Sequence, residues 1–317
     1  MERGYNPVKL DNSTDLLYPL AVTLDGFRKW DKPTEKKLPI EVDVVEFLCS
    51  LGYTGSAVEK DAVIGDWVLI AFYYLLRVGE YTTKDARPDT KQTVQFRIKD
   101  VTFFYYDKQG RLRQLRRDAS DEEILQAAGA TLRLSNQKNG WKGVCIFHFA
   151  NGDEFLYPVR ALARRYIHIR THMKGDKRFN TCALSAYFVN GARKDLTDKD
   201  VRESLKMAAA RLGYPERGIP ISRVDTHSLR AGGANALSLN GYSDLEIQKM
   251  GRWKSDTFKE YIAEGLSQFS VGMSKDMKKT FQYVNVQGGV DADVGVVDVT
   301  EQMVRMPYEV MAPAITV

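Results

Sequence analysis

Cysteine is scarce in this sequence, and its spacing offers no pairs. The three cysteines, Cys49, Cys145 and Cys182, are odd in number, lie far apart and form no Cys-x-x-Cys motif. A disulfide framework or a cysteine-based zinc site is therefore not expected. A reducing compartment agrees with this pattern, because disulfide-rich frameworks belong to oxidising compartments.

Long apolar runs are also missing. The longest, residues 67–76, is about half as long as the segment that a membrane-spanning helix needs. No apolar stretch typical of a signal peptide follows Met1. We therefore expect a soluble, intracellular protein that does not enter a membrane.

Neither sign of charge is in large excess. The 46 lysines and arginines outnumber the 41 acidic residues enough to give a net charge of +5, which suits a polyanionic partner only if the basic side chains cluster. With 317 residues, 44% of them hydrophobic, the chain is long and apolar enough to bury a large core.

The chain divides into three parts by composition. Residues 1–37 are polar, contain three prolines and show no sustained period, so we expect an arm or linker. Residues 38–283 carry the periodic segments and form the expected domain. Residues 284–317 are rich in valine, glycine and aspartate and are expected to be a loosely held tail.

Hydrophobic periodicity predicts several helices in the domain. Apolar residues recur at helical spacing within five segments, and in the second of them nearly every residue from Trp67 onward is apolar, as in a helix buried all round. These segments are residues 41–51, 59–76, 158–173 and 201–212, and the stretch that begins near His227.

Two pairs of strands are expected between these helices. Apolar residues alternate over residues 94–98 and 101–105, and again over 131–135 and 144–149. The basic and then acidic run over residues 111–123 reads as an exposed insertion. The expected fold class is therefore α+β, mainly helical with a small antiparallel sheet.

The second strand pair encloses a turn signal. Asn139-Gly140 is the preferred two-residue hairpin turn, because both positions tolerate positive φ. Lys138 therefore stands beside the tip of a β-hairpin, and Lys142 follows the turn. Lysine is also common at any hairpin tip, where it keeps the surface solvated.

The helix at residues 158–173 carries two histidines and several arginines. His168 and His172 stand at i and i+4, a spacing that metal ligands use, but no third ligand recurs nearby in the sequence. We therefore expect no metal. The arginines are expected on a solvated face or in contact with phosphate.

A group of polar residues lies towards the end of the domain. His227 and Arg230 are three apart at the start of a helix, which places them on one face. Trp253 follows Gly251 by two residues, and Tyr261 lies on a short amphipathic segment. An imidazole, a guanidinium, an indole N–H and a phenol can bind a phosphodiester, move a proton and attack phosphorus. That chemistry requires no cofactor or metal.

These residues carry a resemblance to a known family. Four sequence boxes stand in the order found in the tyrosine recombinases (phage integrases and their relatives), and the match spans residues 38–262. The segments LLRVGEYT and GRWKSDTF are most similar in sequence to recombinases of eukaryotic Crypton-type or DIRS-like mobile elements. The boxes are Leu75-Leu-Arg77-Val-Gly-Glu80, His227-Ser-Leu-Arg230, Gly251-Arg-Trp253 and Tyr261.

The resemblance implies a role for each polar residue. Tyr261 would attack the scissile phosphate and form a 3′-phosphotyrosyl link, and Arg77 and Arg230 would clamp the non-bridging oxygens. His227 would accept the tyrosine proton or hold the phosphate. Taken alone, Tyr261 would be read as a core aromatic residue and Arg77 as an arginine that ends an apolar helix.

Further roles follow from the same resemblance. A hairpin lysine protonates the leaving 5′-oxygen in the family, and Lys138 matches it best, with Lys142 the alternative. The family places histidine or tryptophan where Arg252 stands here, so we expect Trp253 to take the donor role, with Arg252 as an extra clamp. Glu80 is expected to support Arg77 or a neighbouring main chain.

The expected partners are double-stranded DNA and further copies of the chain. The resemblance implies a tetramer on DNA, with a free monomer or dimer, and residues 270–283 as a segment passed to a neighbour or folded back on its own domain. The family's N-terminal DNA-binding domain is present at most as a remnant. Localisation would be nuclear for a eukaryotic element, and otherwise cytoplasmic or in the nucleoid.

Two other functions remain open on the sequence. One is a domesticated, non-catalytic DNA-binding protein that keeps the recombinase fold. The other is a nicking-closing enzyme similar to type IB topoisomerases, which relaxes supercoils without pairing sites.

Overall fold

The structure is a computed structural model of the whole chain. It describes residues 20–23, 37–54, 59–83, 93–135, 143–256 and 259, all of which belong to one unit of the chain, residues 1–266. Most of the expected arm and all of the expected tail lie outside the described residues, as do residues 270–283. Within the described part, no helix is long and apolar enough to cross a bilayer.

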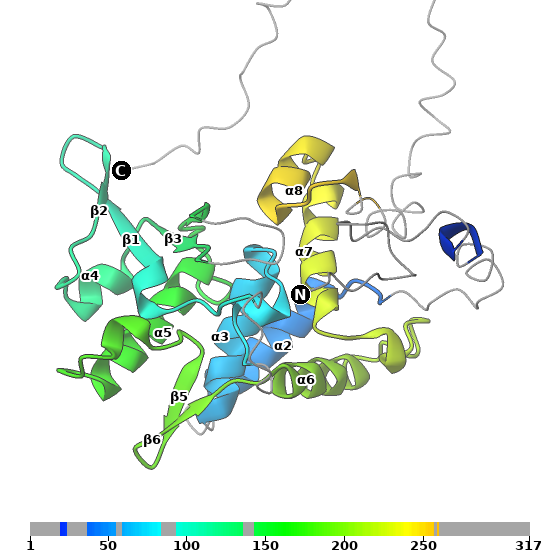
Figure 1. The fold of residues 1–317 in the computed structure, drawn as a ribbon, viewed down its shortest axis with the longest axis horizontal. Helices are drawn as coiled ribbons and strands as arrows, with labels where there is room; N and C mark the ends of the chain where they lie inside the picture. Colours follow the sequence, from blue (N-terminus) through cyan, green and yellow to red (C-terminus); the bar gives the residue numbers. More distant parts are fainter. Residues whose placement is uncertain are drawn as a thin grey trace, which may run out of the picture. The chain divides into compact units, whose positions relative to one another are not determined.

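Helix α3 (Glu59–Tyr73) is the centre of the helical part (Figure 1). Every residue from Val63 to Phe72 is buried, as the apolar sequence from Trp67 onward predicts, and Asp66 is the charged residue within this stretch. Helices α2, α5 and α7 all pack against it, and α6 contacts both α2 and α3. These helices are α2 (Val42–Gly52), α5 (Pro158–His172), α6 (Asp198–Arg211) and α7 (His227–Leu239), and α8 (Asp244–Gly251) packs on α7.

A four-stranded antiparallel sheet lies beside α5, with strand order β2-β1-β3-β4. Its strands are β1 (Val101–Tyr106), β2 (Leu112–Gln114), β3 (Gly129–Arg133) and β4 (Cys145–Phe149), with α4 (Asp121–Leu125) between β2 and β3. A separate hairpin joins β5 (Ala186–Val189) to β6 (Ala192–Asp195), and single 3₁₀ turns occupy Phe179–Thr181 (η3) and Ile221–Arg223 (η4). The mainly helical α+β fold class is thus confirmed.

The second predicted strand pair is present, but the first is not. Strands β3 and β4 pair antiparallel from Gly129↔Phe149 to Arg133↔Cys145, as expected. The expected strand at residues 94–98 is wrong. Only Arg97 makes a bridge there, and a 3₁₀ turn η2 (Ile98–Asp100) follows, because the Asp100 carboxylate accepts from the Arg97 backbone N–H at 2.9 Å.

The basic run at residues 111–117 is more than an insertion. Its centre forms β2, which pairs with β1 from Phe104↔Gln114 to Tyr106↔Leu112 and is exposed throughout. The run thus extends the sheet by one edge strand. Its alternating charges pair locally, with Arg111 and Arg113 both 3.0 Å from the Asp107 carboxylate.

Helix α3 ends one turn earlier than its apolar sequence predicts. It stops at Tyr73, and Leu75 adopts a left-handed conformation with φ of 48°. The Leu76 N–H then reaches back to the Ala71 carbonyl at 2.9 Å. Arg77 therefore precedes a 3₁₀ turn, η1 (Val78–Glu80), instead of completing the helix.

Side-chain caps begin helices α6 and α8. Thr197 and Ser243 cap α6 and α8 with a reciprocal glutamate or aspartate three residues on. Helix α7 differs, because Thr226 has helical dihedrals and makes no side-chain cap. The Asp225 carboxylate instead accepts from the Thr226 N–H at 2.7 Å and pairs with Arg202 of α6 at 3.1 Å, which ties α7 to α6.

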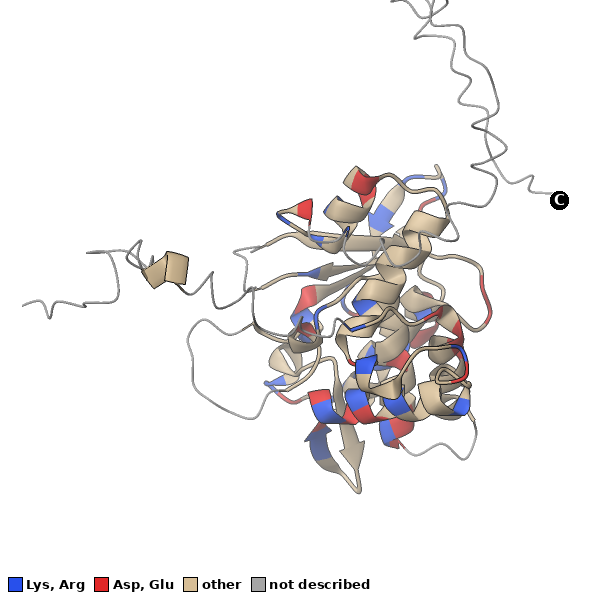
Figure 2. Ribbon diagram, turned by 90° about the vertical axis from the view of Figure 1, so that its right-hand side faces the viewer, with Lys and Arg blue, Asp and Glu red and all other residues tan. Residues whose placement is uncertain are grey.

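Two of the α5 arginines are not on a solvated face, contrary to expectation. Arg165 is buried and donates to the carbonyls of Leu184 and Ala186. Arg164 pairs with Asp66 of α3, with its Nη2 2.6 Å from Oδ1. These arginines hold the α5 side of the molecule together. Figure 2 shows charges of both signs side by side along the helices at its lower end.

Candidate active site

The backbone of helix α7 packs directly against neighbouring main chain at Gly232 and Gly233. A Cβ on Gly232 would lie 2.1 Å from the Ile40 carbonyl oxygen, and one on Gly233 would lie 2.3 Å from that of Phe72. Only glycine leaves room for so close an approach. The Gly-Gly pair therefore seats the start of α7, with His227 and Arg230, against the end of α3.

Arg230 occupies the junction of α3, α7 and α8. Its side chain is fully buried, and its two terminal nitrogens donate to the carbonyls of Leu75 and Gly251. The guanidinium carbon also lies 4.0 Å from the centroid of the Trp253 ring, in cation–π contact. One arginine thus links three segments that are distant in the sequence.

The backbone of the Gly251-Arg252-Trp253 turn allows the Trp253 ring to reach Arg230. Arg252 is left-handed, with φ of 60°, and a Cβ on Gly251 would lie 1.5 Å from the Trp253 ring. The glycine therefore makes space for the indole, and the turn places the indole over Arg230.

Glu80 is the buried carboxylate at this junction. Its oxygens accept from the Arg77 backbone N–H at 3.0 Å and lie 3.4 Å from Arg77 Nη1. Arg252 Nη2 approaches the same carboxylate at 3.1 Å and also donates to the Leu75 carbonyl at 3.0 Å. Arg252 is almost fully buried, so its contacts hold the junction together from inside, whereas Arg77 keeps 25% of its side chain exposed.

Among the described residues of the junction, the arginines outnumber the carboxylates that pair with them. Arg77, Arg230 and Arg252 meet there, and Glu80 is the carboxylate that pairs with two of them. The pKa of Arg252 is lowered, because burial and the nearby charge of Arg77 together outweigh the attraction of Glu80. An anion at the exposed edge would relieve this imbalance.

His227 lies at the exposed edge of the junction. Its pKa is lowered from the usual value, first by desolvation of the ring and then by the positive charges of Arg230 and Arg77. The imidazole is therefore neutral at pH 7 and able to accept a proton beside two guanidinium groups.

The structure brings six of the sequence-predicted residues together and leaves three outside its described part. The nucleophile candidate Tyr261 and the hairpin lysines Lys138 and Lys142 are outside the described residues. The six that meet are Arg77, Glu80, His227, Arg230, Arg252 and Trp253.

Sequence reasoning missed the Leu75 carbonyl, which accepts from both Arg230 and Arg252. No residue type at position 75 signals this contact. It missed the packing role of Gly232 and Gly233 as well, although two adjacent glycines inside a helix are a readable sign of close approach.

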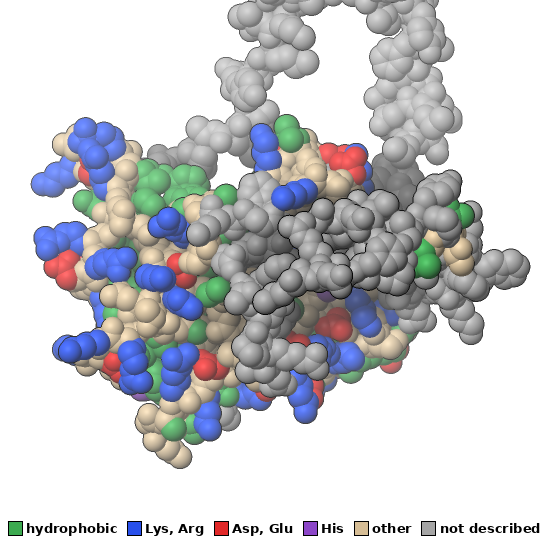
Figure 3. Space-filling view, viewed as in Figure 1, with side chains coloured by type: hydrophobic (Ala, Val, Ile, Leu, Met, Phe, Trp, Pro, Cys, Tyr) green, Lys and Arg blue, Asp and Glu red, His purple; other side chains and the backbone are tan. Residues whose placement is uncertain are grey.

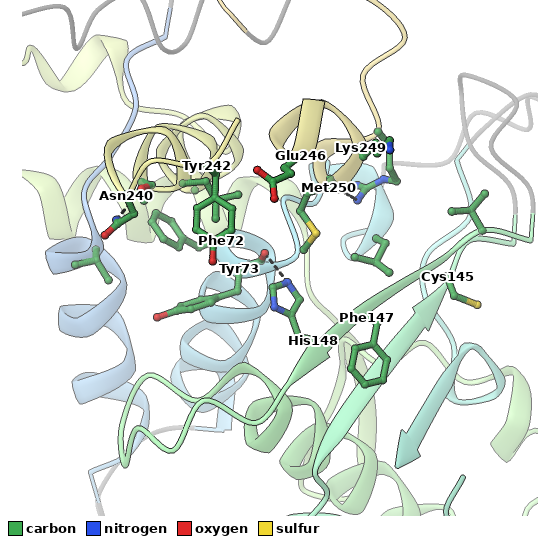
Figure 4. A pocket seen from close by; sticks show the side chains of 17 residues that line it. Phe72, Tyr73, Cys145, Phe147, His148, Asn240, Tyr242, Glu246, Lys249 and Met250 are labelled. Atoms are coloured by element: carbon green, nitrogen blue, oxygen red, sulfur yellow. Dashed lines mark hydrogen bonds between the residues drawn. The ribbon is translucent and has the colours of Figure 1, made fainter. Parts of the chain in front are cut away.

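A groove of about 870 Å³ opens beside the junction (Figure 4). It lies between β4, the end of α3 and helices α7 and α8, and Arg252 forms part of its wall. His148 Nε2 makes a 2.9 Å hydrogen bond with the Tyr73 carbonyl across it. Burial lowers the pKa of His148 to about 4, so the ring is neutral at pH 7 and donates this bond.

Among the described residues, one group has the composition and spacing of a metal site. Glu59, His168 and His172 each offer a ligand atom, and these atoms lie within 4.8 Å of one another. Glu59 begins α3, whereas the arginine junction lies beyond the other end of that helix. The two are separated by a 15-residue helix, roughly 20 Å of helical rise.

Comparison with known proteins gives structural likenesses only. No family model matches the chain, and no curated protein matches it. The XerH site-specific recombinase bound to a palindromic difH substrate has 15% identity and a TM-score of 0.46, with 77% of this chain and 54% of that one covered. This chain thus spans about half the length of that recombinase.

Two further solved structures are similar to the chain. The XerA recombinase has 18% identity and a TM-score of 0.43, over 79% of this chain and 67% of that one. The Tn1549 transposon integrase in complex with transposon right-end DNA has 15% identity and a TM-score of 0.39, over 77% and 68%. Since so few residues are shared, the chemistry of this chain has to be inferred from its own side chains.

Proposed function

We propose that this chain is a DNA strand transferase of the tyrosine recombinase type, which cuts and rejoins DNA through a 3′-phosphotyrosine. The observation that carries the proposal is the meeting of Arg77, His227 and Arg230 in a junction with excess positive charge. Charge of this sign, beside a neutral imidazole, suits the pentacoordinate transition state of phosphoryl transfer, where negative charge builds on the non-bridging oxygens.

The energy of the broken phosphodiester bond is conserved in the phosphotyrosine intermediate. Tyr261 Oη attacks the scissile phosphorus and gives up its proton to His227, while the bond from phosphorus to the 5′-oxygen breaks. Lys138 gives a proton to that oxygen, with Lys142 as the alternative donor. A free 5′-hydroxyl then attacks the phosphotyrosine, restores the phosphodiester and releases Tyr261.

Arg77 and Arg230 have different parts in this scheme. Arg77 is partly exposed and steadied by Glu80, so it can clamp a non-bridging oxygen directly. Arg230 is fixed by two carbonyls and by Trp253. Its charge acts on the same anion from a preorganised position, with the Trp253 ring in contact with its guanidinium.

The proposed partner is double-stranded DNA, bound by more than one copy of the chain. Exposed basic side chains gather over the sheet and α4 (Figure 3), among them Arg111, Arg113, Arg116 and Arg117. Such side chains can follow a phosphate backbone, although several are already paired with Asp107 or Asp118. A mobile-element recombinase of the Crypton or DIRS kind would act in the nucleus as a tetramer on DNA.

One observation favours a second function, a non-catalytic DNA-binding protein with this fold. Arg230 is fully buried, and both of its terminal nitrogens donate to main-chain carbonyls. An arginine so engaged can serve the fold alone. In that case the junction would bind DNA phosphate without cutting the strand.

Covalent trapping on a library of nicked DNA duplexes separates the two functions. A transferase accumulates a protein–DNA adduct that protease removes, whereas a binding protein shifts the DNA without any adduct. Tyr261→Phe should abolish the adduct and keep DNA binding, because only the attacking oxygen is lost. Tyr242→Phe, at an exposed tyrosine, is the matched control and should leave the adduct intact. An adduct that survives Tyr261→Phe would rule out the assigned nucleophile.

A further inference from the structure

The far end of α3 from the arginine junction carries a compact group of metal-ligating side chains. His168 and His172 stand one turn apart on α5, and Glu59 begins α3. One ligand atom from each residue lies within 4.8 Å of the other two. The histidine pair is visible in the sequence, but the carboxylate comes from another helix and is found only in the fold.

His172 is held in an orientation that leaves one nitrogen for a ligand. Its Nδ1 lies 2.9 Å from the His168 carbonyl, so Nδ1 carries the proton and Nε2 carries the lone pair. The ring also stacks on Phe188 of β5, with centroids 4.5 Å apart and planes 2° from parallel. Metal-binding histidines are commonly oriented through such a bond from the second nitrogen to a carbonyl.

His168 supplies a second, independent sign of a ligand. Its Nε2 is buried and has no hydrogen-bond partner among the described residues. The nearest carboxylate oxygen, Glu59 Oε2, is 3.4 Å away, which is too long for a good hydrogen bond. A buried polar atom left without a partner is unfavourable, and a metal ion bridging it to Glu59 would satisfy both.

We propose that Glu59, His168 and His172 bind a divalent transition-metal ion of the zinc class. Two imidazoles and a carboxylate are a common ligand set for zinc, with water in the fourth position. Ligands about 2.0–2.1 Å from zinc in tetrahedral geometry lie about 3.4 Å from one another, so side-chain movements of roughly 1 Å close the site. Magnesium and calcium prefer all-oxygen ligands and are poor occupants.

The ion would act on the fold and not on the phosphodiester. It would link the start of α3 to the end of α5, and through Phe188 to β5. Buried Arg165, one turn before His168, places a positive charge near the ion and weakens its binding, and Glu59 offsets that charge. A stabilising site of moderate affinity is therefore expected, and it is independent of the proposed strand transfer.

The test uses the full chain stripped of metal with a chelator. Zinc should raise the unfolding temperature, magnesium should not, and cobalt should give the visible absorption of a four-coordinate ion. His172→Gln and Glu59→Gln, each at an exposed position, should each weaken zinc binding by at least about 100-fold, since loss of even an outer partner of a metal ligand costs about 10–100-fold.

Two control variants test whether the loss of zinc binding is specific to the proposed ligands. Glu203→Gln, at an exposed carboxylate of α6, and Cys145→Ser, at the exposed thiol, should bind zinc as the native chain does. The proposal is overturned if zinc leaves the unfolding temperature unchanged, if His172→Gln and Glu59→Gln bind zinc normally, or if Cys145→Ser abolishes binding. Both ligand variants should still form whatever DNA adduct the native chain forms.

Discussion

Within the described part of the chain, two buried carboxylates, Asp66 and Glu80, pair with arginines, and their surroundings differ in charge balance. On the α5 side, Arg164 meets Asp66, and the Tyr53 hydroxyl donates to the same carboxylate at 3.0 Å. At the junction beyond the end of α3, Glu80 faces both Arg77 and Arg252, with Arg230 beside them. The Asp66 carboxylate pairs with one arginine, while buried Arg165 nearby donates to main-chain carbonyls. The Glu80 carboxylate pairs with two arginines and lies beside a third.

The pKa shifts follow this difference. Burial lowers the pKa of Arg164, but the charge and hydrogen bond of Asp66, together with Tyr53 and Cys49, outweigh burial and the net shift is upward. For Arg252 the net shift is downward, because burial and Arg77 outweigh Glu80. A balanced pair is complete without a ligand. We expect an anion to stabilise the unbalanced junction further, which is the property a phosphodiester site needs.

Removal of the two carboxylates should have unequal effects. Glu80→Gln leaves Arg252 charged, 3% exposed and without its carboxylate, so it should lower the free energy of unfolding by about 3–5 kcal/mol. Asp66→Asn should lower it by about 1–3 kcal/mol, because Arg164 is 31% exposed and can turn towards water. Urea unfolding of both variants measures the difference.

The ratio of the unfolding free energy lost in Glu80→Gln to that lost in Asp66→Asn tests the charge imbalance. Addition of phosphate or a short DNA duplex should stabilise the native chain through the junction, and Asp66→Asn should keep that stabilisation. A larger loss for Asp66→Asn than for Glu80→Gln would contradict the charge imbalance described here.

A second comparison exchanges arginine for lysine in each region. Arg230→Lys keeps the charge, but one ammonium cannot reach both the Leu75 and Gly251 carbonyls with the planar geometry that a guanidinium provides. Adduct formation on nicked DNA should therefore slow by about 10²–10³-fold, as when one preorganised donor is lost from an active site. Arg164→Lys is the matched control and should leave the rate unchanged. A native rate in Arg230→Lys would favour the purely structural role of Arg230.

The smallest expected effect is on the titration of His227. Its pKa is lowered partly by Arg77, so Arg77→Gln should raise it, and Arg164→Gln should not. Because the neutral ring is the base, adduct formation should fall as the pH drops through this pKa. In Arg77→Gln that fall should begin at a higher pH. NMR titration of the imidazole measures the shift, and equal pKa values in all three proteins would show that Arg77 does not contribute to it.

The helices and the second strand pair could be predicted because their signals are local. Apolar periodicity gave α2 and α5 to within one residue and α6 with its start three residues late, and the Thr197 and Ser243 caps are four-residue patterns. The end of α3 could not be predicted, since Leu75 takes a left-handed conformation in which leucine is rare. The strand expected at residues 94–98 failed because a side-chain contact from Asp100 favours a turn.

For the polar residues, too, the sequence predicts local proximity but not tertiary burial. The spacing of His227 and Arg230 correctly puts them near one another, but it cannot say which arginines become buried. Arg164 pairs with a carboxylate 98 residues earlier in the chain, so its burial depends on the tertiary fold. Glu59 escaped notice as a ligand for the same reason, since nothing near His168 in the sequence points to it.

The order in which the ribosome makes the chain limits when the hydrogen bonds of the Leu75 carbonyl can form. Arg252, which binds both this carbonyl and Glu80, is synthesised 172 residues after Glu80. At roughly 5–20 residues per second, the ribosome takes about 10–35 s to reach it. Until then the carbonyl lacks Arg252 as a donor and Trp253 cannot cover Arg230. A nascent chain that ends before Arg252 therefore lacks the contacts that join Glu80 and the end of α3 to the Gly251–Trp253 turn, so the junction can form only late in synthesis.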